Sequence, residues 1–521
     1  MTKSNSIVHR YLPGHASETR ENAILVPVEP QELADAARKL KDSGLPLVTV
    51  FAADHRAKKK GFCIRYAFRT PESDSFLVLV LSLSSTVFPS LASVYPACAL
   101  YEREIMTMFG LEAEGHPDPR TLLLHEENWP KGVYPLRKDF AWDTRVPRTT
   151  KGEAYRFHTI EGEGIYEIPV GPVHAGIIEP GHFRFSVAGE EIVSLEARLG
   201  WVHKGVEKLF EALPLEKKVL LSERISGDSS FSHSLAFCEA LETLTATKVP
   251  ERAQYLRLVY AELERIANHI GDIGFIMLDT GYSFGGANGS RLRESVMRQN
   301  ELLTGSRFLR GVNIPGGVSR DITEESALEM RRFLAELRKD LAELIRIADG
   351  SASLMNRLAG TGVLPKGVAE DYGVVGVVAR ACGIKKDVRV EHPYAAYASL
   401  TPEITLEKKG DVEARFRIRI AEVLESMRLI ESALSALPKG HLSAPLRPIP
   451  QEGIALSAVE GWRGEIAYAI LAEDGVISRV KVRDPSFINW QIYPYVPSTD
   501  MVPDFPLINK SFNLSYSGND L

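Results

Sequence analysis

The sequence has few cysteines and no large excess of charge of either sign. Only four cysteines occur among 521 residues, at Cys63, Cys98, Cys238 and Cys382. Because they are dispersed, neither a disulfide framework nor a local Cys-x-x-Cys metal chelate can be built from them. The 62 basic and 68 acidic residues give a formal net charge of -6, and no basic tract indicates a nucleic-acid surface. We therefore expect small molecules or proteins as partners and no nucleic acid.

The sequence also lacks a hydrophobic run typical of a secretory signal or a membrane span. The first twenty residues are polar and contain a Pro-Gly pair, so we expect no secretory signal and a cytoplasmic location. The longest uncharged stretch, residues 75–101, includes FLVLVLSL but is interrupted by Pro89 and Pro96. This pattern predicts a buried strand followed by a loop. Any contact with a membrane is then expected to be made through partner proteins.

The chain is long enough for at least two domains, and the predicted fold class is multidomain α+β. Residues 1–140 alternate apolar strand patterns with a helix that begins after a proline and ends at a glycine, which predicts a small α/β domain. Residues 141–160 are polar and irregular, as in a linker. Residues 161–521 open with strands and then become mostly helical, which predicts a larger second domain with β-hairpins.

Two helices of the second domain are predicted from apolar periodicity. The repeats are Leu256, Val259, Leu263, Ile266, Ile270 and Ile273, and Met330, Leu334, Leu337, Leu341, Leu344 and Ala348. An Asp321-x-x-Glu324 pattern predicts the start of the second helix, and Gly350 predicts its end.

The sequence also predicts the local structure of three further segments. The glycine-rich residues 281–290 lack a phosphate-binding fingerprint and are expected to form a tight loop. The pattern of residues 453–482 predicts strands on both sides of an EDG turn. The last thirty residues read as proline-punctuated coil, and the apolar and aromatic residues 505–521 are expected to form an interface segment.

Several motifs indicate a family. Residues 99–140 contain YERE, MFG, EGHP, R-x-LL and PLRKD in one order, and this stretch resembles the 30 kDa subunit of complex I. The second domain resembles the 49 kDa subunit of complex I and the large subunit of [NiFe] hydrogenases, through GPVH, EPGHFRF, HKGVEK, ELERIANHIGDIG and VKVRDPSFIN. Both modules in one chain resemble the large subunits of formate hydrogenlyase and hydrogenase-4 complexes, which are group 4 hydrogenases, and fused complex I subunits.

The resemblance implies where nickel-ligating thiolates would lie. The family's first Cys-x-x-Cys aligns with Ser226 and Ser229, and its second aligns with Ser486 and Asn489. Hydroxyl and amide oxygens cannot replace the four soft thiolates of a nickel-iron centre. We therefore expect no metal and no cofactor bound by this chain.

The quinone site of complex I is also incomplete by the same resemblance. Gly227 stands where the family has its quinone-binding tyrosine, and the hairpin sequence IIEPGHF offers only His174 and His182 as displaced candidates for the histidine. The candidate residues for the ancestral cavity are His174, Glu179, His182, Arg224, Asp228, His233 and Asp484, beside the former ligand positions. They are expected either to relay protons or bind a small polar ligand, or to satisfy one another by hydrogen bonds.

The resemblance implies a subunit of a membrane-associated oxidoreductase, in electron transfer or ion-coupled energy conversion, that is not itself a [NiFe] hydrogenase. Two alternatives stay open, a non-redox conformational-coupling subunit and a modified quinone reductase. The implied partners are an iron-sulfur small subunit like the 20 kDa subunit of complex I, other hydrophilic-arm subunits and antiporter-like membrane subunits. The iron-sulfur cluster is expected in the small subunit, quinone is a possible ligand, and the location is the inner face of the cell membrane.

Overall fold

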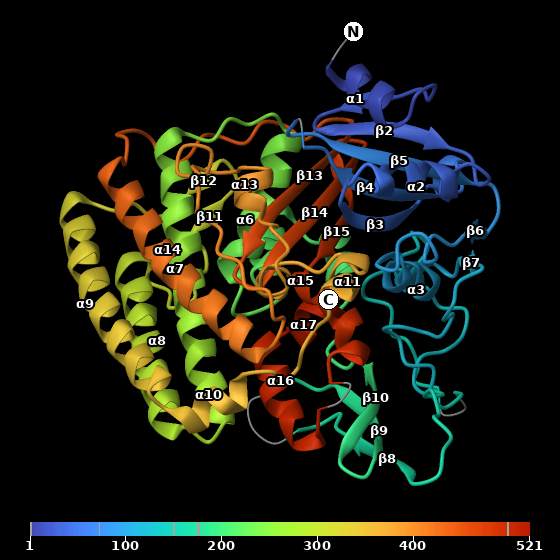
Figure 1. Ribbon diagram of the computed structural model, residues 1–521. Helices are drawn as coiled ribbons and strands as arrows, with labels where there is room; N and C mark the ends of the chain where they lie inside the picture. The colour runs from blue at the N-terminus through green and yellow to red at the C-terminus, as the bar shows by residue number, and fades with distance from the viewer. Residues whose placement is uncertain (1–2, 72, 150–151, 175–177, 498–499) are drawn as a thin grey trace.

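The computed structural model describes residues 3–71, 73–149, 152–174, 178–497 and 500–521. A β-sheet from the N-terminal part lies at one end of the molecule and a bundle of long helices at the other, with a three-stranded sheet between them (Figure 1). This architecture confirms the predicted multidomain α+β fold.

The N-terminal sheet has five strands in the order β1-β2-β5-β4-β3. Strands β2 and β5 are parallel, and the other neighbours are antiparallel. The elements are α1 (Lys3–Tyr11), β1 (Glu18–Arg20), β2 (Ala23–Val28), α2 (Leu33–Asp42), β3 (Leu47–Asp54), β4 (Phe62–Arg69), β5 (Phe76–Leu83), β6 (Val87–Pro89), α3 (Cys98–Phe109) and β7 (Glu112–Glu114), with a short 3-10 turn at Arg56–Lys58.

Both faces of this sheet are covered, which explains the apolar run FLVLVLSL. One face, which includes Ile24 and Leu77, packs with α2 and α3, and the other, which includes Ala23 and Val78, packs into the core of the second domain. A strand buried on both faces is apolar at nearly every position. The predicted strand at β5 is thus confirmed. No helix in the described ranges is long and apolar enough to cross a membrane.

The described residues between β7 and β8 form neither helix nor strand, and they include the proposed linker, residues 141–160, except residues 150–151, which lie outside the described ranges. Limited proteolysis tests the proposed boundaries at residues 140 and 161, which stay a prediction.

A three-stranded antiparallel sheet follows the linker, and three helices follow the sheet. These elements are β8 (Ile165–Val170), β9 (His182–Ala188), β10 (Glu191–Arg198), α4 (Val206–Ala212), α5 (Leu215–Ser222) and α6 (Ser230–Leu244).

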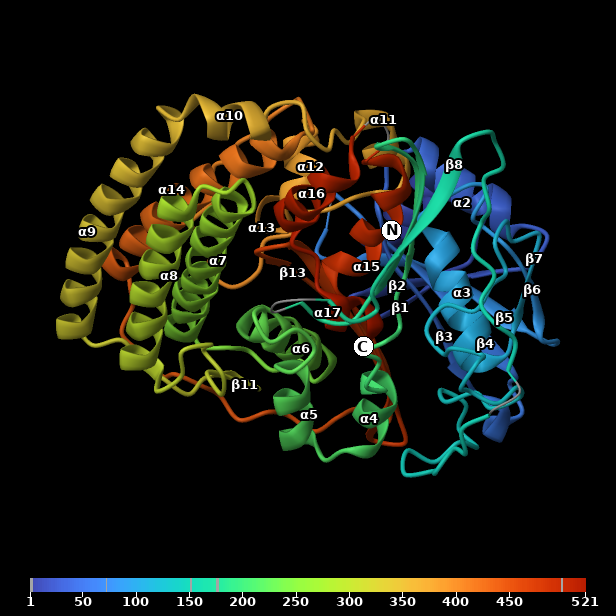
Figure 2. The same ribbon diagram turned by 90° about the horizontal axis from the view of Figure 1, so that it is seen from below.

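Four long helices form the bundle, which Figure 2 shows from below. The two predicted apolar stripes are buried on α7 and α9. The bundle helices are α7 (Glu251–Asp279), α8 (Ser283–Thr304), α9 (Glu324–Asp349) and α14 (Val412–Ser435). Shorter elements connect them: β11 (Asn313–Ile314), β12 (Gly317–Val318), α10 (Ala352–Leu358), α11 (Lys366–Asp371), α12 (Val377–Ala381) and α13 (Val388–Glu391).

The glycine-rich residues 281–290 are mostly helical, so the predicted loop was wrong. They form the first two turns of α8, which lies against α7. A Cβ atom at Gly289 would lie 2.5 Å from the Cα atom of Gly274. The glycines are therefore needed for the close approach of two helix backbones, and this packing outweighs their low helix propensity.

The predicted cap of α9 was also wrong. The helix begins at Glu324, and the hydroxyl oxygen of Thr323 accepts a hydrogen bond from the Ser326 backbone N–H. Asp321 instead pairs with Arg252 at 2.7 Å. The predicted C-terminal end at Gly350 is confirmed.

The predicted strands at residues 453–482 are confirmed as an antiparallel sheet of β13 (Glu452–Gly461), β14 (Gly464–Glu473) and β15 (Val476–Arg483). The predicted coil after it was wrong. The chain continues as α15 (Pro485–Asn489), the 3-10 helices η2 (Trp490–Tyr495) and η3 (Val502–Asp504), α16 (Phe505–Phe512) and α17 (Tyr516–Asp520).

The apolar side chains of residues 505–521 pack inside the chain itself, in a cluster that includes β9 and β10 and in the main core with α7 and α14. Phe505, Ile508 and Phe512 lie at helical spacing and are all buried. Since Pro506 stands in the first turn of α16, it does not oppose the helix. The expected interface segment is therefore part of the core.

Candidate functional site

Most of the predicted site residues lie on or near three segments that contact one another: the start of α6, the short helix α15 and the C-terminal helix α17. Figure 1 labels these helices. Helix α15 is positioned by its first residues. The carboxylate of Asp484 accepts a hydrogen bond from the Ser486 backbone N–H at 2.7 Å, and Pro485 occupies the first helical position. Asp484 therefore caps the helix that carries Ser486 and Asn489, which the sequence predicts to be former ligand positions.

Asp228 forms the charged centre of this cluster, through a bidentate ion pair with Arg463. The two guanidinium–carboxylate distances are 2.7 and 2.6 Å. Burial alone would raise the pKa of the Asp228 carboxyl, but the charge and hydrogen bonds of Arg463 outweigh burial and lower that pKa to about 2. The hydroxyl of Ser226 also donates to Asp228, at 2.8 Å. The Asp228 carboxylate is therefore ionised near neutral pH, and both of its oxygens accept hydrogen bonds.

Ser515 joins the two pairs of former ligand positions. Its hydroxyl oxygen lies 2.9 Å from the hydroxyl oxygen of Ser226, and its backbone N–H donates to the hydroxyl oxygen of Ser486 at 2.9 Å. The same Ser515 hydroxyl oxygen accepts the Gly518 N–H as the N-cap of α17. The C-terminal segment thus lies between Ser226 and Ser486.

The fourth position, Asn489, is engaged with the backbone of Val375. Its side-chain oxygen accepts the Val375 N–H, and its side-chain amide donates to the Val375 carbonyl, both at 3.1 Å. Ser226, Ser229 and Ser486 offer only hydroxyl oxygens, and within the described ranges no group of three His, Cys, Asp or Glu residues could hold a metal ion. A nickel-iron centre, which requires thiolates, does not fit this donor set.

His233 and Asp484 form a buried pair beside this cluster. The Nε2 atom of His233 lies 3.0 Å from the Asp484 carboxylate, and its Nδ1 atom lies 3.2 Å from the hydroxyl of Tyr468. Burial opposes ionisation of Asp484, but the His233 hydrogen bond and the nearby Arg463 guanidinium hold its pKa below the ordinary value. These three side chains form one continuous hydrogen-bonded row.

Glu179, His174 and His182 lie on the hairpin side. The carboxylate of Glu179 accepts the Ser517 N–H at 2.9 Å, which ties this segment to α17. His174 hydrogen-bonds the Gly181 carbonyl at 2.7 Å through Nε2, and His182 hydrogen-bonds a backbone carbonyl at 3.2 Å through Nδ1. The Nε2 atom of His182 is buried and has no partner in the described part of the chain.

Arg224 is the predicted site residue that lies outside the cluster. Its side chain is exposed and donates to the Leu220 carbonyl at 2.8 Å. Arg224 lies just beyond the end of α5, where its side chain turns back along that helix. Its assignment to the cavity was wrong.

Two participants were missed by sequence reasoning. Arg463, the partner of Asp228, lies in the turn between β13 and β14, and no sequence pattern predicted its contact. Ser515 stands in the segment read as coil, and only the tertiary structure brings it to Ser226.

The family motifs of the two modules meet in a buried ionic cluster made of Glu104, Glu207, Arg479 and Lys481. Lys481 on β15 donates to both oxygens of Glu104 on α3, at 2.6 and 2.5 Å, and lies 3.2 Å from Glu207 on α4. Glu207 also pairs with Arg479 at 2.7 Å. YERE, HKGVEK and VKVRD therefore form part of the contact between the N-terminal part and the rest of the chain.

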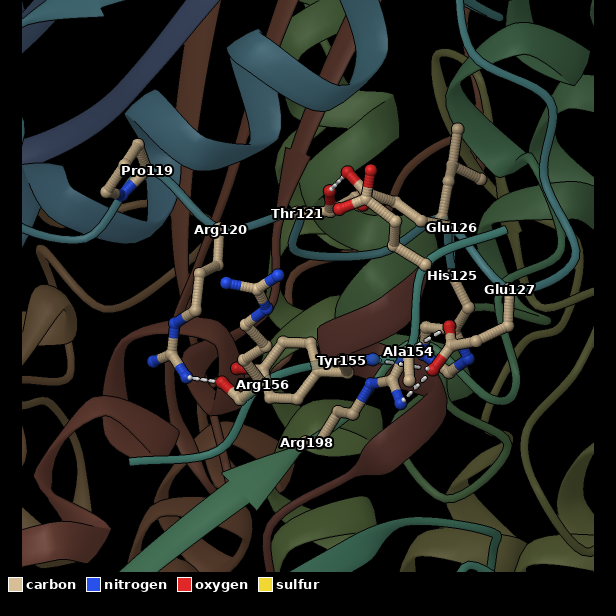
Figure 3. A pocket seen from close by; sticks show the side chains of 12 residues that line it. Pro119, Arg120, Thr121, His125, Glu126, Glu127, Ala154, Tyr155, Arg156 and Arg198 are labelled. Carbon is tan, nitrogen blue, oxygen red and sulfur yellow. Dashed lines mark hydrogen bonds and ion pairs between the residues drawn. The ribbon is translucent and has the colours of Figure 1, made fainter. Parts of the chain in front are cut away.

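A separate pocket of about 270 Å³ lies beside this contact (Figure 3). Arg198 pairs bidentately with Glu127 at 2.8 and 2.7 Å, and Arg120 pairs with Asp118 at 2.7 Å. The Tyr155 ring lies 4.3 Å from the first guanidinium and 5.0 Å from the second. Because both guanidiniums already have carboxylate partners, we assign these pairs a structural role.

Comparisons with known proteins agree with this geometry. Residues 26–146 match the family described as respiratory-chain NADH dehydrogenase, 30 Kd subunit. Residues 279–452 and 446–520 match the family described as respiratory-chain NADH dehydrogenase, 49 Kd subunit.

Two curated relatives come from Escherichia coli (strain K12). Formate hydrogenlyase subunit 5 is 32% identical and the alignment covers 97% of this chain and 90% of that protein. Hydrogenase-4 component G is 33% identical over 92% of this chain and 84% of that protein. A chain in the structure of the membrane-bound sulfane sulfur reductase, an archaeal respiratory membrane complex, aligns with a TM-score of 0.65 and 28% identity, over 69% of this chain and 99% of that one. The chain therefore belongs to the family of fused 30 kDa/49 kDa complex I-type subunits, together with formate hydrogenlyase subunit 5 and hydrogenase-4 component G.

Proposed function

We propose that this chain is a hydrophilic-arm subunit of a membrane-bound, complex I-like oxidoreductase and that it acts in electron transfer without a nickel-iron centre. Relatives named as formate hydrogenlyase, hydrogenase-4 and sulfane sulfur reductase components support the assignment to a respiratory complex. The family resemblance supports three kinds of partner: an iron-sulfur small subunit like the 20 kDa subunit, other hydrophilic-arm subunits and antiporter-like membrane subunits. The cluster belongs to the small subunit, and the chain lies at the inner face of the cell membrane.

The chemistry of the side chains at the four predicted ligand positions is the main support for the proposed absence of nickel. Ser226, Ser229, Ser486 and Asn489 offer oxygen and amide donors where four thiolates are required, and three of them are bound to the C-terminal segment or to the Val375 backbone. The polar groups around Asp228 and Asp484 are then the candidates for proton transfer near an acceptor.

Elemental analysis and EPR of the natively purified complex, oxidised and reduced, test this proposal. We expect reducible iron-sulfur signals and no stoichiometric nickel. Nickel at one per complex would overturn our assignment of the ligand positions. A complex without any redox metal would overturn the electron-transfer role.

The second candidate is a non-redox subunit that couples conformational change to the membrane arm. The mutual hydrogen bonds of Ser226, Asp228 and Arg463 favour it, because they satisfy the polar groups without a ligand. The small subunit separates the candidates. Retained cluster-binding cysteines support electron transfer, and their loss supports mechanical coupling.

The third candidate is a modified quinone reductase. The buried and unpartnered Nε2 atom of His182 supports it, because a quinone carbonyl can accept a hydrogen bond from an imidazole N–H. This candidate requires quinone-dependent oxidation of the reduced complex. An unchanged rate in the His174→Ala, His182→Ala double variant would remove it.

A further inference from the structure

A cavity of about 820 Å³ lies away from the site described above, between the N-terminal sheet and the second domain. Its walls come from the ends of β3 and β4, with Leu47 and Arg69, and from residues 369–374 and 384–391 of the second domain. Ile488 on α15 also lines it. This volume lies in the range of small-molecule binding sites.

Arg69 is buried in this wall, with 2% of its surface exposed. Its Nη2 atom pairs with Glu465 at 2.8 Å and with Glu391 at 3.1 Å. Its Nη1 atom is buried and has no hydrogen-bond partner in the described ranges. Since buried guanidinium donors are almost always paired, this atom offers a donor to an acceptor that the chain itself does not supply.

Lys386 lines the same cavity. Its amine makes no hydrogen bond or ion pair within the described residues, and burial lowers its pKa below the ordinary lysine value, with Glu465 and Glu391 opposing this shift. Glu465 is also shared with Arg483 at 2.6 Å. The Lys386 amine thus stands near two carboxylates that are already paired with Arg69 and Arg483, and it can take an anionic partner of its own.

The remaining wall is largely apolar. Leu45, Leu47, Tyr95, Ile384 and Ile488 line the cavity beside Arg69 and Lys386. The exposed side chains of Lys41, Lys385, Glu370 and Asp371 also line it. A ligand with an anionic head and an apolar body matches a cavity that has cationic side chains in one part of its wall and apolar side chains in another. An inorganic anion would leave most of the volume unfilled.

We propose that this interdomain cavity binds an amphipathic organic anion, whose carboxylate, sulfonate or phosphate head lies between Arg69 Nη1 and the Lys386 amine. Its apolar body lies along Leu47, Ile384 and Ile488. The proposal is independent of the proposed function of the chain. It also places a ligand beside the loop whose Val375 backbone holds Asn489, because the preceding residue, Val374, lines the cavity.

Fluorescence titration of the full chain with 1-anilinonaphthalene-8-sulfonate tests the proposal, and the uncharged N-phenyl-1-naphthylamine serves as the matched probe. We expect one saturable sulfonate-dependent site. Lys386→Met should weaken binding of the anionic probe about tenfold or more, because it removes a charge-assisted contact. Lys386→Arg should restore binding, and Lys339→Met, at an exposed position of α9, should leave it unchanged.

Lys386 makes no hydrogen bond or ion pair with the described residues, so its replacement by Met should not unfold the chain, and equal thermal midpoints test this. Equal affinity of both probes would overturn the anion requirement. Unchanged anion binding in Lys386→Met would overturn the location, and the absence of a saturable site would overturn the proposal as a whole.

Discussion

Replacing Lys481 by methionine removes the ion-pair partner of Glu104 from the buried ionic cluster. Glu104 is 4% exposed, and within the described part of the chain both of its side-chain hydrogen bonds come from Lys481. Glu207 keeps Arg479 and the Val482 N–H. The substitution therefore leaves one buried carboxylate without a partner.

The expected cost follows from this geometry. Removing one partner of a buried ion pair costs about 3–5 kcal/mol of unfolding free energy. Burial already raises the pKa of Glu104 despite Lys481, and in the variant this pKa rises further. A carboxyl whose folded-state pKa is raised destabilises the protein once the pH exceeds its unfolded-state pKa. The loss of unfolding free energy in Lys481→Met should therefore be largest at alkaline pH and should shrink as the pH falls toward the ordinary carboxyl pKa.

Urea unfolding followed by tryptophan fluorescence at several pH values measures this deficit. The double variant Glu104→Gln, Lys481→Met should recover most of the lost stability at pH 8, because no buried charge is left unpaired. Lys409→Met, which breaks an exposed pair with Glu413, should leave the midpoint unchanged. A Lys481→Met variant as stable as the original protein at pH 8 would refute the reasoning.

Three other substitutions, one of them with a matched control, test the packing and the site. Gly289→Ala should cost about 1–3 kcal/mol by overpacking at α7, whereas Gly367→Ala, where an added Cβ meets nothing within 4 Å, should be neutral or stabilising by up to about 1 kcal/mol in thermal unfolding. Ser515→Ala should cost about 1–2 kcal/mol through the lost helix cap, and an unchanged melting temperature would contradict the bridging role. Asp228→Asn should be less stable than the original protein at pH 7, because the carboxylate stabilises the fold only while ionised. This difference should vanish in acid-unfolding curves as the pH falls from the ordinary pKa of 3.8 toward about 2, and a pH-independent difference would exclude the ion pair with Arg463 as its cause.

The strands and long helices were predictable because their burial is periodic. The run at β5 is apolar throughout since both of its faces are covered, and the stripes of α7 and α9 follow the helical repeat. The errors lie where tertiary contacts decide the local structure. Residues 283–290 are helical despite their glycines, which allow the close approach of α7. The helices in residues 505–521 bury their apolar side chains against distant parts of the chain, including α7, α14 and β9.

The site was predictable in its residue types and not in its contacts. Motif alignment placed oxygen donors at Ser226 and Ser486, but their junction through Ser515 depends on segments almost 300 residues apart. The exposure of Arg224 could not be read from its motif either, since neighbouring residues of one turn point in different directions.

The buried ionic cluster bears on the assembly of the chain. The aligned sulfane sulfur reductase chain corresponds to 69% of this protein over 99% of its own length, so a chain similar to about two thirds of this protein occurs as a separate subunit in that complex. In the present chain, separating the two parts would break the ion pair between Glu104 on one piece and Lys481 on the other. Covalent fusion thus guarantees equal stoichiometry and a high effective concentration for a contact that behaves as an obligate heterodimer interface. A chain split between residues 141 and 160 should reassemble when both pieces are produced together, and neither piece should be stable alone.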